Sequence, residues 1–73
     1  MERIIGKVGR VIGPVVEAVG VEQAQMLELV EVGERRLVGE IVRLNGSRAT
    51  IQVYEDTTGL RPGAPVFGSG SPL

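Results

Sequence analysis

The chain has 73 residues, enough for one small domain that hides only ~60% of the surface its unfolded form exposes. It contains no cysteine and no histidine, which excludes disulfides, ordinary zinc sites and catalysis by either side chain. Eight Lys and Arg against nine Asp and Glu give a formal charge of -1, so the excess positive charge typical of DNA and RNA binders is missing. With 42% hydrophobic residues the chain is too apolar to be disordered, yet it has no run approaching the ~20 residues of a membrane span.

Eleven glycines and four prolines separate short runs rich in Val and Ile, a pattern typical of a small all-β barrel or sandwich. The segment Val21 to Leu27 also fits a turn of helix, because its Glu, Gln, Ala, Met and Leu residues favour one. The predicted strands, in chain order, are Arg3–Ile12, Val15–Val19, Met26–Val32, Arg36–Leu44, Arg48–Tyr54 and Pro65–Phe67. We predict a closed, six-stranded β-barrel with Greek-key-like connections, because closing the sheet removes its exposed edges.

One hairpin is indicated more clearly than the rest. Ala49, Ile51 and Val53 alternate with polar neighbours, which gives this strand one apolar face. The preceding Asn45-Gly46 pair tolerates the positive φ of a type I′ turn. We therefore predict a β-hairpin from Gly39 to Tyr54.

The inward faces of the other strands are less clearly marked. Val38, Val42 and Leu44 share one face, with Glu40 as the exception. In Met26–Val32 the alternation of apolar and polar residues shifts by one position partway along the segment, as a β-bulge would cause. The predicted core consists of Val8, Val11, Val16, Leu29, Val38, Ile41, Ile51 and Val53.

A faint internal repeat appears when Gly6–Gly13 is laid on Gly39–Gly46, since Gly, Arg and Gly coincide and the Val, Ile and Leu positions match conservatively. To continue the alignment, the second half of the repeat is shifted by one further residue, so that Val15 is aligned with Ala49. The match there is poorer. Duplication of a half-barrel and chance in a Gly- and Val-rich chain both account for the pattern. Glycines inside the first strand also predict a bend or a close backbone approach.

Two kinds of segment have the composition of a small catalytic or binding site. Glu55-Asp56 could do acid–base chemistry or bind a cation, but a solvated turn has the same composition. Gly6–Gly9 and Gly68–Ser71 lack the spacing and the strand–loop–helix context of a phosphate-binding loop. We therefore predict solvated turns and no nucleotide site.

Arginines supply the remaining candidate. Arg35-Arg36, Arg43 and Arg48 could form a basic patch on adjacent strands, and small barrels do bind oligonucleotides. Such barrels stack bases on exposed aromatic rings, and this chain offers only Tyr54 and Phe67. The favoured interpretation is that the arginines protect strand edges and meet nearby glutamates.

Longer segments resemble one family. Gly9–Val16 resembles the opening strand–turn–strand of rotary ATPase catalytic subunits. Four further segments are similar to the catalytic subunits of V/A-type rotary ATPases, which belong to the ATP synthase alpha/beta family. These segments are Ala24–Gly33, Leu37–Gly46, Ala49–Leu60 and Gly63–Leu73. The resemblance spans nearly the whole chain in order, although Val19–Gln23 fits only loosely.

The resemblance implies a six-stranded N-terminal β-barrel that packs beside neighbouring catalytic and non-catalytic subunits in a hexameric ring. The family's P-loop, catalytic glutamate and arginine finger lie outside this barrel. No catalytic, cofactor-binding, metal or nucleotide-binding residue is therefore expected here, and no enzymatic activity or cofactor. By resemblance, the barrel belongs to the peripheral, cytoplasmic sector of a proton- or sodium-translocating ATPase, without membrane insertion or nucleic acid.

Residues 1–73 are predicted to form a single domain, either excised or engineered, with residues 68–73 leading towards a nucleotide-binding domain outside this sequence. Leu60, Val66 and Phe67 either cover the end of the barrel or contact a following domain or a neighbouring protein. The isolated chain is expected to be a monomer, with a weak dimer as the next alternative. The alternative function is a small barrel that binds an oligonucleotide or another ligand.

Overall fold

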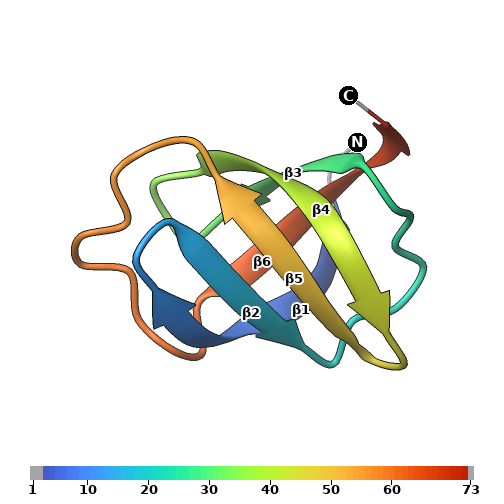
Figure 1. Ribbon diagram of the computed structural model, residues 1–73, viewed down its shortest axis with the longest axis horizontal. Coiled ribbons are helices and arrows are strands. Elements are labelled where there is room, and N and C mark those ends of the chain that lie inside the picture. The colour runs from blue at the N-terminus through green and yellow to red at the C-terminus, as the bar shows by residue number, and fades with distance from the viewer. Residues whose placement is uncertain (1–2, 73) are drawn as a thin grey trace.

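The computed structural model describes residues 3–72, and the side chains of residues 3–69. Its six strands form a closed barrel in the order β1-β2-β5-β4-β3-β6, and every neighbouring pair is antiparallel (Figure 1). The strands are β1 (Arg3–Ile12), β2 (Val15–Val19), β3 (Glu28–Val32), β4 (Leu37–Asn45), β5 (Arg48–Val53) and β6 (Pro65–Pro72). The predicted all-β class and closed six-stranded barrel are confirmed, as is the hairpin of β4 and β5.

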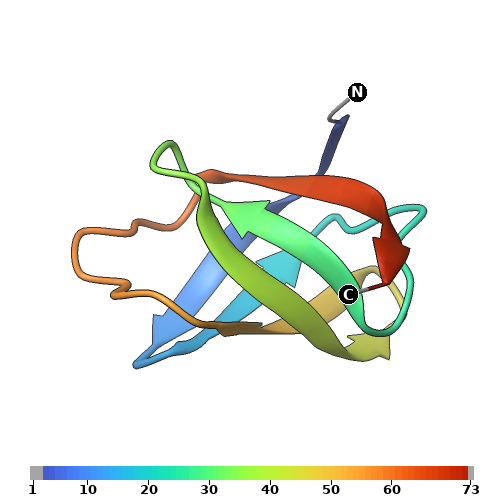
Figure 2. The same cartoon turned by 90° about the horizontal axis from the view of Figure 1, so that it is seen from above.

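The last strand is longer than predicted. β6 continues to Pro72, beyond the expected end at Phe67, because its pairing with β3 extends as far as the partners Pro72 and Glu28. The long connection between β5 and β6 projects from one end of the barrel (Figure 2). The boundary towards a following domain stays a prediction.

The segment between β2 and β3 contains no turn of helix, so that alternative is wrong. Gln23 and Leu27 have φ values of 58° and 65°, in the left-handed region, which a right-handed helix cannot accommodate. The backbone N–H of Leu27 instead donates to the carbonyl oxygen of Ile41 at 2.8 Å. That bond ties the end of the segment to β4, where tertiary structure overrides local helix propensity.

The core lies inside the barrel and is made of side chains from all six strands. Five of the eight predicted core residues are buried, and a sixth, Val11, is half-buried against the core. The buried apolar residues are Ile5, Val8, Val16, Ala18, Val21, Val30, Val32, Leu37, Ile41, Ala49, Ile51, Val53 and Val66. The other two predicted core residues, Leu29 and Val38, are only half-buried and lie on the outward phase of their strands, so those two assignments are wrong.

The phase of β4 explains the error at Val38. Leu37, Gly39 and Ile41 are buried, so the residues between them face outward. The register with β5 then shifts between Ile41 and Arg43, and Leu44 packs against the core after the shift. The outward phase of β4 is therefore nearly as apolar as its inward phase, which periodicity alone cannot resolve.

A buried glutamate explains why the alternation of apolar and polar residues is interrupted in β3. Glu28 is fully buried, and its Oε1 accepts a hydrogen bond of 3.0 Å from the backbone N–H of Gln25. Glu28, Val30 and Val32 form the inward face, which leaves Leu29 outside. The predicted irregularity is present as a register shift against β6 between Glu28 and Val30.

Replacing Glu28 by alanine is expected to lower the free energy of unfolding by about 1–3 kcal/mol, because a partly buried donor loses its acceptor. Glu28→Gln keeps an acceptor oxygen in the same place and is expected to restore part of that loss. Chemical denaturation of the three proteins measures both effects. Equal stability of Glu28→Ala and the parent would contradict the assigned role.

The two halves of the barrel are related by an internal pseudo-two-fold. The register shift in β1 falls between Val8 and Arg10, at the positions equivalent to Ile41 and Arg43 of β4. Leu27 donates to the carbonyl of Ile41, and Gly63 donates to that of Val8 at 2.7 Å. Mapping β1, β2 and β3 onto β4, β5 and β6 also reproduces the strand order around the barrel. These shared irregularities favour duplication over chance.

The alignment of Val15 with Ala49 in the second half of the repeat is wrong. Val16 lies opposite Val11 in the first hairpin, and Ala49 lies opposite Leu44 in the second. Ala49 is thus equivalent to Val16 rather than Val15, with the separation that relates β1 to β4. The sequence match is weak here because the buried residues of each equivalent pair, Val16 with Ala49 and Ala18 with Ile51, differ in size.

Candidate functional surface

The two predicted acidic residues do not converge on a common point. Glu55 Oε2 accepts a 2.6 Å hydrogen bond from the backbone N–H of Val38. Asp56 Oδ1 accepts from the hydroxyl of Thr58 at 2.7 Å and from its N–H at 2.9 Å, as in a solvated turn. Those two bonds lower the pKa of Asp56. Within the described part of the chain no three Asp or Glu side chains are grouped to hold a metal ion.

The lowered pKa of Asp56 predicts a small pH effect. A carboxyl whose pKa is lower in the folded state stabilises the fold above its ordinary value of 3.8, and the contribution disappears as the pH falls below it. The parent is therefore expected to exceed Asp56→Asn in stability at neutral pH and to converge with it in acid. Thermal melts of both proteins across that range provide the measurement. A difference that grows on acidification would contradict the assignment.

The glycines of β1 serve strand packing. A Cβ on Gly6 would lie 2.8 Å from the carbonyl oxygen of Val19, and one on Gly9 would lie 2.9 Å from Val19 Cγ1. Because Gly6–Gly9 lies within strand β1 and is not followed by a helix, its N–H groups do not form a phosphate-binding loop. The predicted close backbone approach is confirmed.

The predicted arginine patch is divided by the fold. Arg36 Nη1 lies 3.1 Å from Glu31 Oε1, and its guanidinium carbon lies 3.6 Å from the centre of the Phe67 ring. Arg35 donates from Nη2 to the carbonyl oxygen of Thr58. These two arginines thus hold the turn between β3 and β4 to its neighbours.

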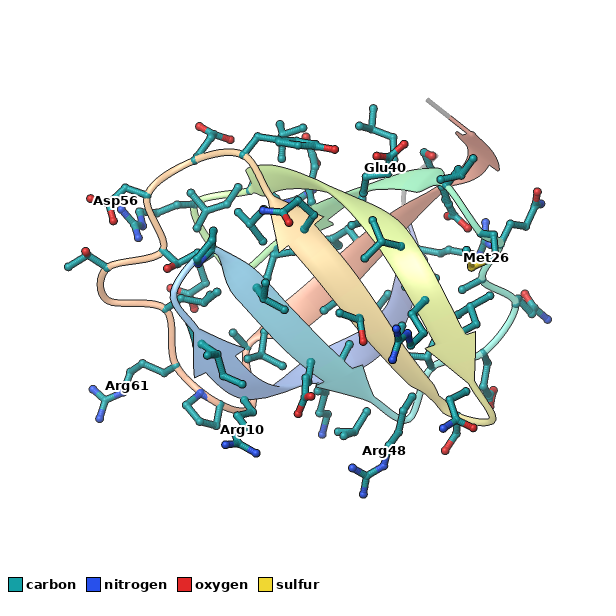
Figure 3. The ribbon with its side chains drawn as sticks, viewed as in Figure 1. Arg10, Met26, Glu40, Arg48, Asp56 and Arg61 are labelled. Atoms are coloured by element: carbon teal, nitrogen blue, oxygen red, sulfur yellow. The ribbon has the colours of Figure 1, made fainter. Side chains whose placement is uncertain are left out.

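Arg43 and Arg48 instead share a hollow of about 520 Å³ with Arg10, which our sequence reasoning missed. Glu17 and Thr50 lie between them on β2 and β5 and also line it. We call these five residues the basic face; Arg10 and Arg48 point from the lower edge of the barrel in Figure 3. The signal for Arg10 was available, because the internal repeat places it on the position of Arg43.

A second surface lies towards the opposite edge, where Glu40 is labelled in Figure 3. Tyr54 donates from its hydroxyl to Glu40 Oε1 at 2.8 Å, and this bond to a carboxylate raises the pKa of Tyr54. Val42 is 41% exposed and Tyr54 is 56% exposed, while Val38 is half-buried. With Glu55, these residues (Val38, Glu40, Val42, Tyr54 and Glu55) form what we call the acidic face.

The apolar residues near the chain exit have separate positions. Val66 is fully buried and Leu60 packs against the core, so both help to close the barrel. Phe67 is half-buried, with Arg36 over its ring. Leu60 and Arg61 also line a hollow of about 490 Å³ at the end of the barrel.

Comparison with known proteins gives a consistent picture. Residues 8–70 match the beta-barrel domain of the ATP synthase alpha/beta family. The chain is 71% identical over 68 residues to the A subunit of the A-type ATP synthase of Metallosphaera sedula, covering 93% of this chain and 12% of that protein. Identity is 62% to the A subunit of the Hyperthermus butylicus A-type ATP synthase and 57% to the V-type ATP synthase alpha chain of Clostridium novyi, each over 93% of this chain.

These relatives are much longer than the chain, which spans 11% and 12% of the last two. No helix in residues 3–72 is long and apolar enough to cross a membrane. The closed barrel, the match over residues 8–70 and the high identities agree with the resemblance carried by the sequence motifs. The chain belongs to the ATP synthase alpha/beta family, as its beta-barrel domain.

Proposed function

We propose that this chain is the structural assembly barrel of the catalytic A subunit of a V/A-type ATPase. It packs beside neighbouring catalytic and non-catalytic subunits in the collar of a hexameric ring. The ring belongs to the cytoplasmic sector of an ion-translocating ATPase. The barrel itself hydrolyses no ATP and holds its parent polypeptide in place.

The match of nearly the whole barrel to the beta-barrel domain of these ATP synthase proteins carries this proposal. The chemistry of the surface agrees with it. Glu55, Asp56, Arg35 and Arg36 bond to neighbouring backbone or side chains, so they stabilise turns. A convergent set of acid, base and nucleophile, which catalysis requires, is not formed by these residues.

A domain exchange tests the assembly role. The barrel of the Metallosphaera sedula relative is replaced by this chain, and the hybrid is mixed with its partner subunits. Native mass spectrometry is expected to show hexamers for the hybrid and none for a version without any barrel. A hybrid that fails to assemble, while remaining folded by circular dichroism, would overturn the proposal. ATP hydrolysis by the purified 73-residue chain would overturn its claim of inactivity.

The alternative of an oligonucleotide-binding barrel has less support. The basic face does gather three arginines. However, Tyr54 lies on the acidic face and Phe67 lies under Arg36, so neither ring is placed to stack a base beside them. Single-stranded DNA affinity with a steep salt dependence would revive this alternative.

A further inference from the structure

The arginines of the chain fall into two groups. Arg3, Arg35 and Arg36 bond to backbone carbonyls, to a carboxylate or to an aromatic ring, so they stabilise the fold. All but one of the others line the hollow of the basic face, where their charge has no such structural use. Within residues 3–69, the arginines that make no hydrogen bond or ion pair are Arg10, Arg43, Arg48 and Arg61.

The strand register places two of the free arginines at the ends of one row across four strands. Arg10 of β1 pairs with Glu17 of β2. Glu17 pairs in turn with Thr50 of β5, which pairs with Arg43 of β4. The two arginines are exposed and the two central residues are half-buried, so the row lies on the outer surface. Neighbouring strands are ~4.8 Å apart, which places the arginine Cα atoms at most about 14 Å from each other.

Register shifts orient both ends of this row. The pairing of β1 with β2 shifts just before Arg10, and the pairing of β4 with β5 shifts just before Arg43. Such bulges occur beside binding sites, where they redirect a side chain and increase the local twist. Because the two shifts are related by the pseudo-two-fold, each half of the barrel presents one arginine to the same hollow.

The β4–β5 side of the hollow offers positive charge and donors without an acid. Arg43 lies opposite Thr50, two residues from Arg48 along β5, so the two arginines are diagonal neighbours roughly 7–8 Å apart. Guanidiniums at this separation repel each other, and an anion between them relieves the repulsion. The hydroxyl of Thr50 and the side-chain amide of Asn45 add further donors. Glu17, the one carboxylate lining the hollow, lies on the β1–β2 side.

We propose that the basic face binds a short phosphate chain between Arg43 and Arg48, with Arg10 closing the site from β1. Guanidinium groups bind phosphate oxygens bidentately, and three arginines against one glutamate leave +2 for a ligand with several negative charges. Arg10 and Arg48 both point from the lower edge of the barrel in Figure 3, so a ligand reaches both from the same side.

The size and lining of the hollow agree with such a ligand. Its volume of about 520 Å³ lies within the ~300–1,000 Å³ typical of small-molecule sites. Among residues 3–69, no aromatic side chain lines it, so the phosphate groups are recognised and a base is not. This site goes beyond the assembly role proposed above and does not depend on it.

An NMR titration of the chain with inorganic triphosphate, at low and fixed ionic strength, tests the site. The amide signals of Arg43, Arg48 and Thr50 are expected to shift and to reach saturation. Arg43→Gln and Arg48→Gln are each expected to weaken binding about five- to tenfold, because each removes a charge-assisted contact. Glu17→Gln is expected to tighten binding, because the carboxylate that it removes repels phosphate.

Arg61→Gln is the matched control, because Arg61 is also unpaired within residues 3–69 but does not line the hollow. It is expected to bind as the parent does, and thermal melts establish that all variants are folded. ATP is expected to bind no more tightly than triphosphate, and much tighter binding of ATP would overturn recognition through the phosphates alone.

Three further results would overturn the site. The first is the absence of saturable shifts in the parent. The second is a loss of affinity in Arg61→Gln as large as that in Arg43→Gln, since net charge alone would then explain binding. The third is binding of oligothymidylate without binding of triphosphate, which would favour the oligonucleotide alternative instead.

Discussion

Ile51→Ala is expected to lower the free energy of unfolding by about 2–5 kcal/mol, a large share of the ~5–15 kcal/mol typical of small domains. Ile51 is fully buried and lies opposite Ile41 of β4 on one side and Val16 of β2 on the other. Truncation removes buried apolar surface and leaves a cavity where three strands meet.

Urea denaturation of the parent and of Ile51→Ala measures the loss. Gln52→Ala is the matched control, because Gln52 is the next residue of β5 and is only half-buried on the outward phase. It is expected to change stability by less than about 1 kcal/mol. A larger effect at Gln52 than at Ile51 would reverse the assigned faces of the strand.

Gly39→Val is expected to destabilise the barrel by about 3 kcal/mol or more, at the upper end of overpacking effects. A Cβ at this position would lie 2.8 Å from the carbonyl oxygen of Gln52 and 2.9 Å from Ile51 Cγ2. The first is backbone in a paired strand, which cannot move without breaking the register between β4 and β5. The variant is expected to be largely unfolded at physiological temperature by circular dichroism.

Gly46→Ala separates steric clash from backbone strain. Gly46 has a φ of 62° in the hairpin turn, but a Cβ there would meet no atom within 4 Å. It is expected to cost only about 1–2 kcal/mol, the usual penalty for a left-handed non-glycine residue. If Gly39→Val proved no more harmful than Gly46→Ala, close strand approach would not be the reason for glycine in β4.

Much of the barrel could be predicted from sequence because its turns and its best strand carry unambiguous chemistry. Asn45-Gly46 set the hairpin, and the alternation around Ile51 set the inward face of β5. The errors at Leu29 and Val38 have a different origin. Periodicity reports which residues are apolar, and it cannot tell a surface covered by the core from one suited to a partner.

The surface could be predicted less well than the core. Arg43 and Arg48 were paired with Arg35-Arg36 because they are near in sequence, but the antiparallel arrangement places Arg10 beside them instead. Glu28 was missed because a glutamate in a strand is usually solvated, and the sequence does not show that folding brings the backbone N–H of Gln25 to its carboxylate.

The pseudo-two-fold has a consequence for how this chain tolerates rearrangement. Arg3 pairs with Gly68, so the start of β1 and the middle of β6 lie side by side. A circular permutant opened at the Gly33 turn would run β4, β5, β6, β1, β2 and β3, with the parent's succession of hairpins and crossovers. The two halves would exchange places in the chain while each connection kept its kind, so the permutant is expected to close the same barrel.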